Sequence, residues 1–104
     1  MLVSEAFPEL SQELEGLLRN KGEAELADEV SDLKLFDRCR CGDDFCSTMY
    51  TQPEPRRRYG PDHRSMDLDA NTGMIIVDVV ERQIVCIEIL YRDAIRKKLL
   101  EVLP

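Results

Sequence analysis

The segment DRCRCGDDFC, residues 37–46, contains three cysteines within eight positions: Cys39, Cys41 and Cys46. A hairpin that turns at the two aspartates places Cys41 opposite Cys46, and Cys39 opposite Thr48. Because side chains alternate between the two sides of a strand, all three thiols then lie on one side of the hairpin. Grouped thiols can bind a metal ion, act as nucleophiles or fill an apolar space, so this segment poses the main chemical question of the sequence.

Zinc is the metal that such a group predicts, because zinc takes four cysteine or histidine ligands in tetrahedral geometry. His63, the only histidine, is the candidate fourth ligand beside Cys39, Cys41 and Cys46. The spacing C-x-C-x4-C differs from the usual pair of C-x2-C motifs, and Cys86 or a carboxylate is an alternative to His63. A zinc-binding module is therefore one hypothesis for this chain.

Burial in the core is the interpretation that the sequence favours over a cofactor. Leu33, Leu35 and Tyr50 share a face of the predicted hairpin with the thiols, and free cysteine behaves as a small buried hydrophobe. The N-terminus also lacks the basic and apolar layout of an export signal. The sequence thus predicts a cytoplasmic protein whose cysteines stay reduced.

A reactive thiol is the third interpretation. Cys41 opposite Cys46 can form a reversible disulfide, and the neighbouring Arg38 and Arg40 can lower a thiol pKa. Strand alternation turns both arginines away from the thiols, however, which weakens this effect. A thiol redox protein, or a cysteine-based enzyme with His63 as its base, ranks below the other two hypotheses.

Residues 1–32 are predicted to form a pair of antiparallel helices. Apolar residues recur at three- and four-residue spacing from Phe7 to Leu18, which predicts an amphipathic helix that begins near Ser4 or Pro8. The segment NKG ends this helix, and a shorter one follows over residues 23–31. Because the link is so short, the two helices should pack side by side.

Residues 33–91 are predicted to form a five-stranded antiparallel sheet, made of two hairpins and a short strand. The apolar period changes to two at the start of this region, and turn-forming residues separate its segments. The predicted strands cover residues 33–41, 45–51, 64–69, 74–80 and 84–90. Three prolines and a glycine make residues 52–63 a loop, which we expect to be the most mobile segment.

The clearest hairpin joins the last two strands. If Val80 faces Ile84 across a three-residue loop, Ile75 faces Ile89 and one face is wholly β-branched. We expect the helices to cover that face. Its residues are Ile75, Val77, Val79, Val85, Ile87 and Ile89. A helix that begins at Asp93, within residues 92–104, completes an α+β fold in a single domain.

The opposite face of this hairpin carries Ile76, Val80 and Ile84, and is too apolar to lie uncovered in water. A homodimer mate or another protein partner would cover it, so the sequence favours a protein-interaction or regulatory module. Asp78 and Glu88 on this face can pair as acid and base or bind a cation. No phosphate-binding glycine loop, G-x-S-x-G or H-E-x-x-H motif occurs, so an enzyme is the weaker hypothesis.

A basic cluster in the long loop is the remaining candidate contact site. Arg56, Arg57, Arg58 and Tyr59 form a run of the kind that contacts phosphates or stacks on bases. The net charge of −7 and the pI of about 4.7 oppose general attraction to nucleic acid or to anionic membranes. Charged residues also interrupt the longest apolar segment, residues 74–90, so no membrane span is expected. A protein partner is favoured over nucleic acid.

The segment GMIIVDVVERQIVCIEILYRDAIRKKL, residues 73–99, resembles the end of a family of small, mostly bacterial β-rich domains of unknown function. In that family an apolar-apolar-Asp strand meets a strand that ends in Ile-Glu-Ile-Leu, usually after a glycine where this chain has Cys86. The resemblance covers at most residues 45–100. It implies a β-rich fold and carries no activity, because none is assigned to the family.

Overall fold

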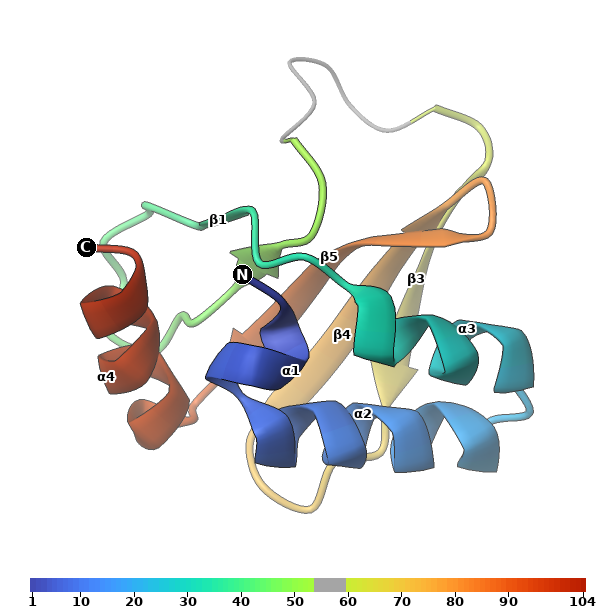
Figure 1. Cartoon of the computed structure of the whole chain (residues 1–104), viewed down its shortest axis with the longest axis horizontal. Coiled ribbons are helices and arrows are strands. Elements are labelled where there is room, and N and C mark those ends of the chain that lie inside the picture. Colours follow the sequence, from blue (N-terminus) through green and yellow to red (C-terminus); the bar gives the residue numbers. More distant parts are fainter. Residues whose placement is uncertain (54–59) are drawn as a thin grey trace.

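The computed structural model describes residues 1–53 and 60–104, and it has the predicted α+β fold. Three short N-terminal helices lie on one face of a five-stranded antiparallel sheet, and a fourth helix lies near one end of the sheet (Figure 1). The helices are α1 (Val3–Ala6), α2 (Pro8–Asn20), α3 (Ala24–Glu29) and α4 (Asp93–Val102), with a 3₁₀ turn η1 (Val30–Asp32). The strands are β1 (Asp37–Arg38), β2 (Met49–Tyr50), β3 (His63–Leu68), β4 (Met74–Val80) and β5 (Gln83–Leu90).

The N-terminal helices follow the predicted apolar pattern. Pro8 occupies the first position of α2, where its missing N–H is not needed and its fixed φ suits a helix start. Leu10, Leu14 and Leu18 form the buried side of α2. After the NKG stop, α3 packs back against α2 as the short link requires.

The strand order is β1-β2-β5-β4-β3, so the chain crosses from β2 to the far edge of the sheet before it returns through β4 and β5. The β4–β5 hairpin has the predicted pairs Ile75–Ile89 and Val77–Ile87 in its outer half. A β-bulge between Asp78 and Val79 then shifts the register by one residue. The later half of the predicted register is therefore wrong.

The register shift between β4 and β5 shortens the turn and moves Ile84 to the other face of the sheet. Val79 pairs with Ile84, and the turn contains only Glu81 and Arg82, with φ of 51° and 66°. Positive φ at both positions is typical of a two-residue hairpin turn. Ile84, predicted for the helix-free face, is instead part of the core and only 2% exposed.

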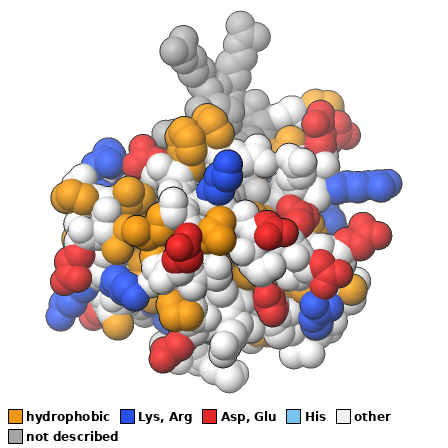
Figure 2. All heavy atoms as spheres, in the orientation of Figure 1, with side chains coloured by type: hydrophobic (Ala, Val, Ile, Leu, Met, Phe, Trp, Pro, Cys, Tyr) orange, Lys and Arg blue, Asp and Glu red, His pale blue; other side chains and the backbone are white. Residues whose placement is uncertain are grey.

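The core lies between the helices and one face of the sheet. Val3, Leu14 and Leu18 from the helices are buried there with Val77 and Ile87 from the sheet. Leu99 is the buried residue of α4 and belongs to the same cluster. On the outside of this layer, acidic side chains are spread over the surface and hydrophobic side chains gather between α1 and α4 (Figure 2).

The first hairpin is shorter than predicted but keeps its expected register. Each of β1 and β2 has two residues, and the Cys39 N–H donates to the Thr48 carbonyl oxygen at 2.9 Å. The intervening loop closes with a hydrogen bond from the Cys46 N–H to the Asp43 carbonyl oxygen at 3.3 Å. Half of the long predicted loop 52–63, residues 54–59, lies outside the described residues, and His63 at its end already belongs to β3.

Candidate metal centre

The first hairpin brings three thiols together. Cys39 follows β1, Cys41 lies in the loop, and Cys46 forms a bridge with Leu90 of β5. Their sulfur atoms all lie within 4.8 Å of one another. The predicted convergence of Cys39, Cys41 and Cys46 on one side of the hairpin is therefore confirmed.

The loop is anchored to the rest of the sheet at its far end. The Tyr91 N–H donates to the Phe45 carbonyl oxygen at 2.9 Å, and the two rings stack with centroids 5.4 Å apart. Gly42 has φ of +81°, a conformation that favours glycine and lets the chain turn between Cys41 and Cys46. The position of the thiols is thus set by backbone and ring contacts outside the group.

The sulfur spacing suits a thiophilic metal ion. Zinc–sulfur bonds of about 2.3 Å in tetrahedral geometry place the sulfur atoms roughly 3.8 Å apart. Closing the group from within 4.8 Å to that distance requires each separation to shrink by about 1 Å or less. The three thiols therefore fit three of the four positions around a tetrahedral ion.

The thiols already act as one electrostatic unit. Partial burial raises the pKa of Cys46, but hydrogen bonds with the Thr48 hydroxyl and backbone and with the thiols of Cys41 and Cys39 outweigh it, so the pKa is lowered. The backbone N–H of Asp43 lowers the pKa of Cys41, yet its hydrogen bonds with Cys39 and Cys46 raise it to about 11. Cys46 therefore ionises before Cys41.

The expectation that these cysteines fill the core is wrong for all three. Cys41 is exposed, and Cys39 and Cys46 are only half-buried. Cys86 alone is buried, where loss of water and the nearby charges of Asp78 and Glu88 raise its pKa. Cys86 is therefore the cysteine that behaves as a small hydrophobe.

A pocket of about 290 Å³ adjoins the thiols and is lined in part by Arg38, Arg40 and Arg96. The Arg38 guanidinium donates to the backbone carbonyl oxygens of Leu103 and Cys39, the latter at 3.3 Å. Arg40 donates to the Pro104 carbonyl oxygen at 3.3 Å. These contacts hold the end of α4 beside the cysteine loop and place Arg96 of α4 in the pocket wall.

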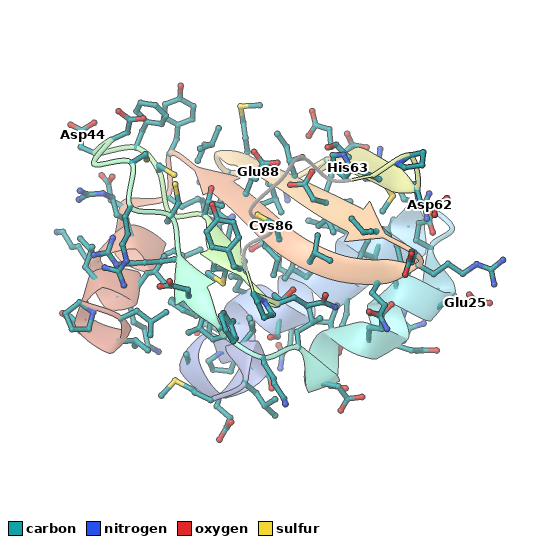
Figure 3. The ribbon with its side chains drawn as sticks, turned by 90° about the horizontal axis from the view of Figure 1, so that it is seen from above. Glu25, Asp44, Asp62, His63, Cys86 and Glu88 are labelled. Carbon is teal, nitrogen blue, oxygen red and sulfur yellow. The ribbon has the colours of Figure 1, made fainter. Side chains whose placement is uncertain are left out.

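His63 does not join the thiols. It lies on β3, and its Nε2 is 2.9 Å from Oδ1 of Asp78. Asp44, in the cysteine loop, lies at one end of the molecule, and His63 lies away from it, beyond Glu88 and Cys86 (Figure 3). Within residues 1–53 and 60–104, no histidine, fourth cysteine or carboxylate completes the group. The structure thus brings together three of the four predicted ligands.

The helix-free face of the sheet carries a second polar cluster around Asp78. Oδ1 of Asp78 accepts hydrogen bonds from the Ser65 hydroxyl at 2.6 Å and is paired with His63. A hydrogen bond with Asp78, partial burial and the Asp78 charge raise the pKa of Glu88 to about 7. The Ser65 hydroxyl and Asp78 Oδ1 both meet Nε2 of His63, at 3.4 and 2.9 Å, whereas the serine and aspartate of the hydrolase relay contact different ring nitrogens.

The predicted interaction residues are placed only in part. Ile76 and Val80 are half-buried on the helix-free face, and Met74 beside them is 38% exposed. The cluster of Arg56, Arg57, Arg58 and Tyr59 lies outside the described residues. No helix in the described part of the chain has the length and apolarity to cross a membrane.

Two features of the surface could not be found from the sequence. Arg96 is one of three consecutive basic residues on α4, and its place beside the thiols depends on how α4 packs. Glu13 of α2 and Arg92, which precedes α4, form an ion pair at 2.9 Å beside a pocket of about 550 Å³. Both depend on tertiary packing between distant segments.

The resemblance of residues 45–100 to a family of small β-rich domains stays a prediction. Comparison with family models, with curated proteins and with solved structures finds no significant match to this chain.

Proposed function

We propose that this protein binds a thiophilic divalent metal ion, zinc first, through Cys39, Cys41 and Cys46. The observation that carries the proposal is the approach of the three sulfur atoms to within 4.8 Å of one another. Their burial supports it, because none of the three is fully buried, whereas cysteines kept for packing normally are. Thiolate ligands select soft and borderline ions such as zinc over magnesium or calcium.

The ion would act first on the stability of the hairpin. The strands β1 and β2 have only two residues each, so few ladder hydrogen bonds hold the cysteine loop. A metal ion that joins Cys39 to Cys46 closes this loop and stabilises the folded state by its binding free energy. The role that this supports is that of a small metal-stabilised module.

The test compares zinc affinity in a variant that lacks one of the three clustered thiols with that in a variant that lacks Cys86. Cys41→Ser removes a ligand at an exposed position, so the fold should persist while zinc affinity falls by at least a hundredfold, about 2.7 kcal/mol. Cys86→Ala removes the buried thiol and should keep wild-type zinc affinity. Equal affinities for wild type and Cys41→Ser, measured by competition with a chromogenic chelator, would contradict the proposal.

Protein interaction through the helix-free face is the second candidate function. Met74, Ile76, Val80 and Leu90 expose apolar area on this face around the Asp78 cluster. Light scattering over a range of concentrations tests the homodimer that would cover it. A molar mass that equals that of one chain at every concentration, both for wild type and for Ile76→Glu, would count against a homodimer.

A further inference from the structure

Three arginines line the pocket beside the thiols, and their side chains differ in how they are bound. Arg38 donates to backbone carbonyl oxygens, and Arg40 donates to the Asp37 carboxylate at 3.1 Å and to Pro104. The half-buried Arg96 side chain has neither a hydrogen bond nor an ion pair to residues 1–53 or 60–104. Arg96 is therefore the guanidinium in this pocket that is available to an added anion.

The thiols leave one coordination position of a tetrahedral ion to be filled. Among the described residues, no histidine, additional cysteine or carboxylate lies with the three thiols as a fourth ligand. His63 instead contacts Asp78. Zinc sites with three protein ligands keep their fourth position for an exchangeable molecule. The pocket volume of about 290 Å³ is at the lower end for ligand sites, so the molecule it takes is small.

We propose that the fourth position is taken by a small thiol that also carries a carboxylate, with its sulfur on the metal ion and its carboxylate on Arg96. This inference rests on the proposed metal binding. Zinc accepts a thiolate as its fourth ligand, as in sites with four cysteines, and the planar guanidinium fork matches a carboxylate. The thiol binds as thiolate and releases its proton to solvent, so no oxidant or reductant takes part.

Cobalt(II) in place of zinc makes the fourth ligand visible, because its d–d absorption reports coordination geometry and ligand type. Anaerobic cobalt-loaded protein is titrated with mercaptopropionate, which has both groups, and with mercaptoethanol, which lacks the carboxylate. Both thiols should change the absorption bands while gel filtration shows that the metal stays with the protein. Mercaptopropionate should bind about tenfold more tightly, which corresponds to ~1.4 kcal/mol.

Arg96→Gln separates the carboxylate contact from the metal bond. The variant should lose the tenfold preference and keep the affinity for mercaptoethanol, whereas Lys97→Gln, an exposed neighbour on α4, should behave as wild type. An unchanged preference in Arg96→Gln overturns the role of Arg96.

Other outcomes separate this inference from the proposed function. Cobalt bound without any response to either thiol overturns the open position, and a changed spectrum in Asp43→Asn would then identify a protein ligand. Failure to bind cobalt or zinc at all overturns the proposed function, and the inference with it.

Discussion

At the scale of single residues, the carboxyl pair on the helix-free face has the clearest electrostatic consequence. The pKa of Glu88 is raised to about 7 by its hydrogen bond with Asp78, its partial burial and the Asp78 charge. Burial raises the pKa of Asp78, but hydrogen bonds with Glu88, Ser65 and His63 outweigh this and lower it. Below about pH 7 the pair therefore holds one proton, mainly on Glu88.

This raised pKa predicts a stability that falls as pH rises. Between the ordinary glutamate pKa of 4.5 and about 7, the folded state binds more protons at Glu88 than the unfolded state. Glu88→Gln imitates the protonated form, so it should flatten this fall and be more stable than wild type at pH 8 by roughly 1 kcal/mol, after allowance for solvent screening. His63, which faces Asp78, is present in both proteins, so the difference isolates Glu88.

Urea unfolding from pH 5 to pH 8 measures the effect. Glu25→Gln, which changes an exposed glutamate of α3, is the control and should follow the wild-type curve (Figure 3). A Glu88→Gln curve parallel to wild type would show that the pair does not share a proton.

The sequence predicted the positions of those side chains whose face of the sheet follows from the alternation along a strand. Cys39, Cys41 and Cys46 converge because their spacing in a hairpin places them on one side. His63 could not be placed in the same way, because its position depends on where β3 begins after a long loop. The Asp78–Glu88 pair could be predicted, because the outer half of the predicted β4–β5 register already places both residues on one face, two positions apart.

At the scale of elements, the turn before β4 depends on a single glycine. Gly73 has φ of +65°, and a Cβ there would lie 2.4 Å from the Leu90 carbonyl oxygen. Gly73→Ala should therefore destabilise the protein by more than 2 kcal/mol, because positive φ costs about 1 kcal/mol and the backbone must also move. Thermal unfolding measures this loss.

Gly22 provides the matched control for this substitution. It has a similar φ of +79°, but a Cβ there has no heavy atom within 4 Å. Gly22→Ala should lower the free energy of unfolding by only about 1 kcal/mol, because the positive φ is unfavourable for alanine but no steric clash is added. Equal losses for the two variants would contradict the steric role of Gly73.

The elements themselves were largely predictable, and their irregularities were not. Apolar periods of three to four and of two predict α2 and the β4–β5 hairpin, because each reports one buried face. The bulge opposite Asp78 and Val79 leaves Val85 of β5 without a register partner, and nothing in the apolar pattern indicates it. The Glu-Arg turn also lacks the Asn-Gly or Asp-Gly signal of two-residue hairpins, so a longer loop fitted the sequence equally well.

At the scale of the whole molecule, stability depends on the layer between the helices and one face of the sheet. Val77 is fully buried in this layer, so Val77→Asp places a carboxylate where it has neither water nor a partner. This variant should be unfolded at room temperature by circular dichroism. Val80→Asp makes the same change on the half-exposed opposite face and should stay folded. A folded Val77→Asp protein would contradict the assignment of faces.

Native mass spectrometry of the protein purified without added metal tests the central claim most directly. If Cys39, Cys41 and Cys46 form a metal centre, the mass should exceed that of the polypeptide by one zinc ion per chain. A strong chelator should remove the ion and lower the melting temperature, on the order of 10 °C if the ion is present at a hundred times its Kd. A mass equal to the bare chain, with a melting temperature that neither zinc nor the chelator changes, would contradict it.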